Sequence, residues 1–217
     1  MADQSLQRFQ AFQAALADVQ KQVQIEIALP DLENLKNAGY KLCFAKKVGT
    51  EDFNVVWQSY DAYLFSNNFS WTPMYQLFGS NTFQGDVTVR VSTNVRDIGL
   101  GETSVLSPSG ILQPPSTGGP ETAITMNNEY GSIHPGVNQL STGIDGKQVS
   151  TPIYVAVNPV VMGPTQLTPV EKVLVWFEQN VETSTMFSTS RSNPVEIDLT
   201  ATNSATRRYE DQVWVTP

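Results

Sequence analysis

The sequence contains one histidine and one cysteine, the residue types that most often supply a catalytic base or nucleophile. A Ser-His-Asp triad needs an imidazole base, but His134 lies in the run Gly-Ser-Ile-His-Pro-Gly, which predicts a turn. No Gly-x-Ser-x-Gly elbow is present to hold a serine opposite it. Cys43 alternates with Leu42 and Phe44 in an apolar run, which predicts a buried and inert thiol. These residues favour a protein that is not an enzyme.

Metal and cofactor chemistry is not indicated by the residue types either. A zinc site usually draws on several His or Cys ligands, and a calcium loop clusters carboxylates at short spacing. Gly118-Gly119 is followed by Pro120, whereas a phosphate-binding loop would continue with Lys and then Ser or Thr. We therefore expect no metal and no cofactor.

Paired carboxylates are the remaining catalytic option. Glu196 and Asp198 lie two residues apart on a predicted strand and share a face, as an acid and a base could in a glycoside hydrolase. However, they alternate with apolar residues, namely Val195, Ile197 and Leu199. This alternation is typical of a solvated face above a buried one, so we expect these carboxylates to be ordinary surface groups.

A dense group of aromatic residues is more informative about binding. The segment from Trp57 to Phe78 interleaves aromatic side chains with amides and hydroxyls, and its runs Ser-Asn-Asn and Trp-Thr-Pro are typical of loops. Exposed Trp and Tyr beside amides suit sugar rings, lipid headgroups or another protein. Our candidate ligand-binding residues are Trp71, Tyr75, Asn67, Asn68 and Tyr63. We expect a loop to present Trp71 to solvent.

The N-terminal segment, residues 1–38, is predicted to be helical. Apolar residues recur at spacings of three and four from Ser5 to Gln24, which predicts an amphipathic α-helix. A second helical turn is predicted from Asp31 to Asn37, with Gly39 placed to end it. The apolar stripe of the first helix could pack on the body, pair with copies of itself or enter a lipid interface.

Residues 39–217 are predicted to form the body of a mainly β protein, an antiparallel β-sandwich. The period changes to two after Gly39, and Tyr40–Lys46 with Phe53–Gln58 predict a hairpin. Val173–Phe177 is apolar on both faces, which predicts a central strand. Long loops are predicted at 107–120 and 131–149. Further strands are predicted at Val87–Val91, Ala123–Asn127, Pro152–Asn158, Lys172–Thr183, Val195–Thr200 and Gln212–Thr216.

The charge and hydropathy of the chain limit its partners. A net charge of −8 repels phosphate backbones, so we expect no nucleic-acid partner. No apolar segment is long enough to span a membrane, and the N-terminus lacks the apolar stretch of a secretory signal. We therefore expect a soluble, cytoplasmic protein, with secretion by another route left open.

The general plan, an amphipathic N-terminal helix before an aromatic-rich β-sandwich, resembles that of small pore-forming toxins such as the actinoporins. Their aromatic headgroup-binding motif has no match here, so no site residue is carried over. Three hypotheses remain: a non-enzymatic binding or self-assembly protein, a membrane-active protein that inserts its N-terminal helix, and an enzyme with an aromatic-lined pocket. The first is favoured. It implies a homo-oligomer and a carbohydrate or lipid-headgroup ligand.

Overall fold

The computed structural model describes residues 20–217, which form fifteen strands and the helix α2 (Leu29–Asn37). The fold is therefore mainly β. The largest sheet has seven strands in the order β10-β9-β4-β1-β14-β15, with β5 also paired to β4. Their bounds are β1 Lys21–Ile27, β4 Ser66–Ser80, β5 Arg96–Ile98, β9 His134–Thr142, β10 Gln148–Val155, β14 Ser204–Glu210 and β15 Val213–Val215.

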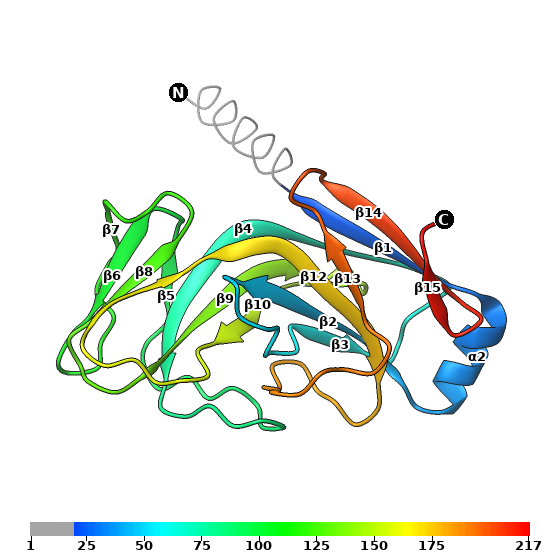
Figure 1. Cartoon of the computed structure of the whole chain (residues 1–217), viewed down its shortest axis with the longest axis horizontal. Coiled ribbons are helices and arrows are strands. Elements are labelled where there is room, and N and C mark those ends of the chain that lie inside the picture. The colour runs from blue at the N-terminus through cyan, green and yellow to red at the C-terminus, as the bar shows by residue number, and fades with distance from the viewer. Residues whose placement is uncertain (1–19) are drawn as a thin grey trace, which may run out of the picture.

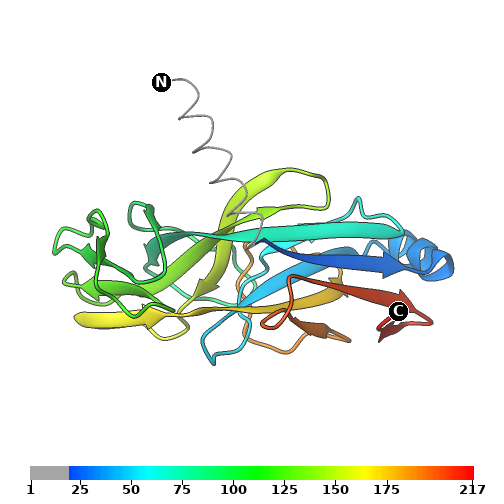
Figure 2. The same ribbon diagram turned by 90° about the horizontal axis from the view of Figure 1, so that it is seen from above.

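Two four-stranded sheets complete the described fold, in the orders β13-β12-β2-β3 and β11-β8-β6-β7. In Figures 1 and 2, α2 and the β14–β15 hairpin lie at one end of an elongated molecule, and β6, β7 and β8 lie at the other. The bounds are β2 Lys41–Val48, β3 Gln58–Tyr60, β12 Pro169–Glu178 and β13 Val195–Asp198 in one sheet, and β6 Glu102–Leu106, β7 Ser116–Thr117, β8 Ile124–Asn128 and β11 Gly163–Leu167 in the other.

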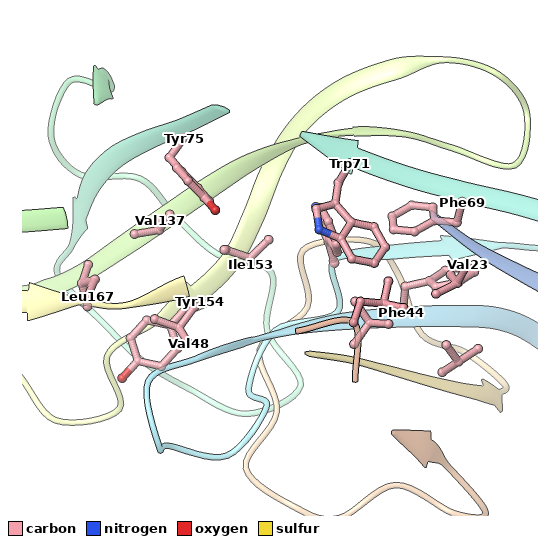
Figure 3. Close-up of a cluster of buried hydrophobic side chains, with 14 of the residues drawn as sticks. Val23, Phe44, Val48, Phe69, Trp71, Tyr75, Val137, Ile153, Tyr154 and Leu167 are labelled. Atoms are coloured by element: carbon pink, nitrogen blue, oxygen red, sulfur yellow. The ribbon is translucent and has the colours of Figure 1, made fainter. Parts of the chain in front are cut away.

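The main core lies where the β13-β12-β2-β3 sheet faces the seven-stranded sheet. Phe69 and Trp71 of β4 point toward Phe44 of β2 (Figure 3). The rings of Phe44 and Phe69 stack with centroids 4.3 Å apart, and Trp57 meets Phe69 edge to face at 5.0 Å. All four side chains are buried. Burying each such ring stabilises the fold by about 1.5 to 3 kcal/mol, so this contact holds the two sheets together.

The strand β1 corrects the predicted N-terminal helix. Residues 5–19 of that helix lie outside the described residues, but Lys21–Gln24 belong to β1. Val23, Ile25 and Ile27 are buried and alternate with half-buried residues, which is the period of a strand. β1 pairs antiparallel with β4 and parallel with β14, so part of the predicted helical segment 1–38 is a central strand of the body.

The second predicted helical turn is confirmed as α2, which begins two residues earlier than expected. Pro30 lies in its first turn, where the missing N–H costs no helical hydrogen bond. Gly39 follows the last turn with a φ of 72°, a left-handed conformation that ends the helix.

Several predicted strands are confirmed where local alternation or a continuous apolar run is strong. Ala123–Asn127 overlaps β8, Val195–Thr200 overlaps β13, and Gln212–Thr216 overlaps β15. Val173–Phe177 lies in β12. This strand is central in its sheet, between β13 and β2, as predicted. Pro152–Asn158 overlaps only the end of β10.

Other strand predictions are wrong. Val87–Val91 forms no regular strand, and Thr88 makes only an isolated bridge to Thr185. The second arm of the predicted hairpin begins at Gln58, because residues 53–57 pack as an irregular segment before β3. The predicted loop 131–149 contains β9, one of the longer strands. Its composition resembles a loop, but its buried residues pair with β4 and β10 on either side.

The predicted loop around Trp71 is likewise part of a strand, the 15-residue β4. Pro73 lies where the pairing with β9 shifts register between Trp71 and Tyr75, so its missing N–H breaks no regular ladder. The side-chain amide of Gln139 donates to the carbonyl oxygen of Thr72 at 2.9 Å and stabilises this irregularity. Because the proline falls at a bulge, β4 continues through it.

Candidate functional site

A cavity of about 500 Å³ lies at the helical end of the molecule. It opens between the end of β12, the residues before β13, α2 and the β14–β15 hairpin, of which the last two lie at the right of Figure 1. Ligand pockets typically measure about 300 to 1,000 Å³, so this cavity could hold a small molecule. It is lined by Asp31, Asn34, Leu35, Ala38, Tyr40, Phe177, Ser192, Asn193, Tyr209 and Gln212.

The apolar wall of the cavity is an aromatic cluster centred on Phe177. Its ring lies parallel to that of Trp214 at 5.6 Å and tilted against that of Tyr209 at 4.9 Å. Tyr63 packs on Phe177 from another side at 5.7 Å. Tyr40 is half-buried and adds a further ring to the lining. Such packing fixes the ring planes, so the wall is rigid before any ligand arrives.

The polar groups of the cavity come from the elements that surround this wall. Asn34, Ser192, Asn193 and Gln212 are exposed and line it with amides and a hydroxyl. Asp31 lies in the first turn of α2. It is the one carboxylate among the described residues that line the cavity. Amides donate and accept hydrogen bonds, so this lining suits a ligand that carries several hydroxyls.

Hydrogen bonds tie the surrounding elements together. The Nδ2 of Asn193 donates to the carbonyl oxygen of Gln212 at 2.8 Å and to the Tyr209 hydroxyl at 3.5 Å. The carbonyl of Asn193 accepts from the indole N–H of Trp214 at 2.9 Å. On the other side, Asp31 accepts from the backbone N–H of Asp211 at 2.8 Å. The helix, the loop and the hairpin are thus joined around the cavity.

Three residues at this site adopt left-handed backbone conformations although none is glycine. Asn193 has a φ of 44°, Asp211 of 53° and Gln212 of 61°. Asp211 and Gln212 are the two central residues of the β14–β15 turn, since Glu210 pairs with Val213. Positive φ at both positions is the type I′ hairpin turn, which prefers Asn-Gly. Gln212 is therefore strained, and such strain gathers at functional sites.

Two phenols near the cavity, those of Tyr63 and Tyr209, stay neutral at physiological pH. Burial raises the pKa of Tyr63 to about 12, and burial also raises the pKa of Tyr209. The Tyr63 hydroxyl donates to the carbonyl of Tyr40 at 3.0 Å, which fixes the chain at the end of α2. The wall therefore offers neutral aromatic surface and hydrogen bonds.

The residue that the sequence favoured most for ligand binding, Trp71, is only 2% exposed. Its indole N–H donates to Oε2 of Glu171 at 2.8 Å, and the ammonium of Lys46 lies 4.5 Å from its ring centroid. Lys46 and Glu171 form an ion pair at 2.6 Å. The prediction of an exposed loop tryptophan is therefore wrong, because Trp71 completes a buried polar cluster between the sheets.

The other four predicted residues do not share one surface. Tyr75 and Asn67 are buried, and Asn67 donates to the carbonyls of Ile25 and Leu64. Asn68 is exposed on β4, where it accepts from Gln22 at 3.4 Å. Tyr63 is buried behind the aromatic wall. Of the five candidates, Tyr63 is the one that contacts the cavity's lining, and it supports Phe177 rather than facing a ligand.

His134, Cys43, Glu196 and Asp198, the candidates for catalysis in the sequence, are engaged in or consistent with structural roles. His134 is not in a turn but begins β9, where Nδ1 donates to the carbonyl of Ala156 at 2.7 Å. Cys43 is buried as predicted, and burial raises the pKa of its thiol well above its usual range. Glu196 and Asp198 are exposed as predicted, and both pair with Lys172.

The aromatic cavity was missed because its residues come from four distant segments: 31–40, 177, 192–193 and 209–212. No local pattern joins them. One local pattern could have indicated part of this site. Asp211-Gln212 lies between two alternating stretches, as the central pair of a tight hairpin turn would.

Comparisons with protein-family models, with curated proteins and with solved structures found no match. Among residues 20–217, no helix has the length and apolar character needed to cross a membrane.

Proposed function

We propose that this protein is a non-enzymatic binding protein with a β-sandwich body, and that the aromatic cavity between α2 and the β14–β15 hairpin binds a carbohydrate. The observation that carries the proposal is the aromatic lining, in which the rings of Phe177 and Tyr209 pack together and Tyr40 adds a third ring, beside amide side chains. The apolar faces of a sugar ring pack on aromatic rings, and its hydroxyls need the paired donors and acceptors that amides supply.

The charges around the cavity favour a neutral sugar over a lipid headgroup. In the described chain, the lining residues include the carboxylate Asp31 but neither lysine nor arginine. A phosphate group is usually bound by arginine or lysine. A phosphate-bearing headgroup would meet a negative side chain here without a compensating cation.

Self-assembly into a homo-oligomer is the second candidate function. Leu29, Leu64 and Phe65 are each at least 60% exposed, and the backbone of Phe65 accepts a hydrogen bond from Ile27 beside the start of α2. Exposed apolar side chains that gather in one place favour association. This candidate does not require the cavity, and both functions could coexist.

The test uses Tyr40→Ala, with a panel of neutral mono- and disaccharides as probes and isothermal titration calorimetry as the measurement. At least one saccharide should bind saturably to the wild type. Tyr40→Ala should weaken that binding at least tenfold, because it removes an aromatic face from the lining while the Tyr40 carbonyl that accepts from Tyr63 remains.

The matched control is Tyr130→Ala, which removes an exposed tyrosine from the loop after β8 without touching the cavity. It should leave saccharide binding unchanged. If no saccharide binds, or if both substitutions weaken binding equally, the carbohydrate proposal is wrong.

A further inference from the structure

A second cavity, of about 470 Å³, is lined by residues other than those of the aromatic one. Its lining comes from the β2–β3 loop, the residues after β10 and the connection between β12 and β13. Backbone hydrogen bonds hold the first and third of these segments together: Val56 donates to Thr185 at 2.8 Å, and Phe187 donates to Asn54 at 2.8 Å. The two loops therefore form one framework around the cavity.

The unusual residue in this lining is Arg191, whose side chain is only 9% exposed. Its Nη1 donates to Oε1 of Glu178 at 2.7 Å, and its guanidinium lies 4.2 Å from the ring centroid of Phe187. Glu178 is held in turn by the indole N–H of Trp176 at 2.6 Å. These contacts fix the guanidinium in place and use one of its two hydrogen-bonding edges.

The other edge of Arg191 is unused within the described part of the chain. Both Nε and Nη2 are buried without a hydrogen-bond partner. A buried donor without a partner is rare in proteins, because it has lost its hydration and gained nothing in return. Asn54, in the same lining, has a buried acceptor without a hydrogen-bond partner, the Oδ1 of its amide. Two such groups on one cavity point to a ligand.

The free edge of Arg191 indicates which ligand. The Nε–H and Nη2–H groups point in parallel, and this fork matches the two oxygens of a carboxylate or of a phosphate. Glu51, Asp52 and Glu196 line the same cavity and outnumber its two cations, Arg191 and Lys47, which disfavours a multiply charged anion. A ligand group with a single negative charge fits these surroundings better.

We propose that the Nε–Nη2 edge of Arg191 binds the carboxylate of a small organic acid in this second cavity. Both nitrogens are closed to solvent, so binding requires that the exposed residues Ser188, Thr189 and Ser190, which line the cavity next to Arg191, move aside when the ligand enters. The Glu178 ion pair keeps the guanidinium oriented during this shift. The proposal is independent of the carbohydrate site, because the two cavities share no lining residue.

The experiment observes the arginine Nε–H signals by ¹H–¹⁵N NMR while sodium acetate is added at constant ionic strength, balanced with sodium chloride. Arg191→Lys identifies the Arg191 signal by its loss. In the wild type, acetate should move this signal along a saturable curve, whereas chloride alone should not. A response that is linear, or equal with chloride, would overturn the proposal.

A second variant keeps the test valid if Arg191→Lys does not fold. Val157→Trp, at a 44% exposed position in the lining, should fill the cavity and reduce the acetate response at least fivefold with Arg191 intact. Val149→Trp, at a 37% exposed position of β10 outside the lining, is its control and should respond like the wild type. Tighter binding of sodium phosphate than of acetate would contradict the choice of a carboxylate.

Discussion

At the scale of single residues, Lys46 and the half-buried Glu171 of one sheet contact the buried Trp71 of the facing sheet. Lys46 has a fully buried side chain, and its ammonium is held by Glu171 and by the face of Trp71. Burial lowers the pKa of Lys46 to about 8, although the Glu171 carboxylate opposes this change. An ammonium group loses its hydration in the interior, and here the ion pair recovers only part of that loss.

This lowered pKa predicts a dependence of stability on pH. The unfolded chain keeps Lys46 protonated up to its ordinary pKa of about 10.5, whereas the folded chain releases the proton near pH 8. The unfolded state therefore binds more protons between these values, so this residue's contribution to stability rises with pH there. Over pH 8 to 9.5, the unfolding free energy of the wild type should gain roughly 1 to 2 kcal/mol relative to Lys46→Met.

The measurement is urea unfolding at several pH values, and the comparison with the variant cancels the titration of Cys43 and the tyrosines. Lys147→Met is the control, because Lys147 is 79% exposed and its loss should leave the pH dependence unchanged. Parallel pH profiles for the wild type and Lys46→Met would mean that Lys46 keeps an ordinary pKa in the folded protein.

At the scale of elements, the β14–β15 hairpin combines a structural cost with a position at the aromatic cavity. A type I′ turn places Gln212 in a left-handed conformation, which costs a residue with a side chain about 1 to 2 kcal/mol more than glycine. The same residue lines the cavity. If the cavity binds a carbohydrate as proposed, the strained Gln212 side chain contributes to that binding.

Gln212→Gly tests this explanation. It should raise the free energy of unfolding by roughly 0.5 to 1 kcal/mol, since the larger backbone entropy of unfolded glycine offsets part of the relief. It should also weaken the binding of any saccharide identified for the cavity at least threefold. Thermal unfolding and calorimetry measure the two effects.

Asn180→Gly provides the comparison, because Asn180 also has a positive φ, of 57°, but lies outside the cavity's lining. Its substitution should leave affinity unchanged. A Gln212→Gly protein that is more stable and binds equally well would show that Gln212 has no role in binding.

At the scale of the whole molecule, the two ends of the described chain meet in the seven-stranded sheet. β1 lies between β4 and β14, and its parallel pairing with β14 runs from Gln22 opposite Ser204 to Ile27 opposite Tyr209. The strand is therefore bonded on both sides and buried on one face. Such a central strand opens only when much of the sheet opens.

Hydrogen exchange tests this arrangement directly. Backbone amides of Val23, Ile25 and Ile27 should exchange only through near-global unfolding, and Ile25→Ala should destabilise the protein by about 2 to 5 kcal/mol. The exposed loop residue Ser109 provides the internal comparison and should exchange fast. Equal exchange at both places would mean that β1 is not a stable strand.

Local sequence patterns were sufficient to predict the mainly β character, α2 and several strands. Pro30 marks the start of α2 and Gly39 marks its end. Each does so through a backbone conformation that depends on that residue alone. The continuous apolar run Val173–Phe177 identified the central strand β12, because a strand buried on both faces needs apolar residues at every position. The alternation around Glu196 likewise separated the wet face of β13 from its buried face. Each of these features is a property of neighbouring residues.

The burial of the polar and aromatic residues, and the partners they contact, depend on the tertiary structure. Trp71 is buried because its indole finds Glu171 one hundred residues further along the chain. β1 is a strand because β4 and β14 supply hydrogen bonds on both sides, although its residues also continue a helical spacing. The aromatic cavity and the unpaired edge of Arg191 arise where distant segments converge. Hydrogen-bond partners and cavities depend on contacts between residues far apart in sequence, and a pattern read along the chain does not contain those contacts.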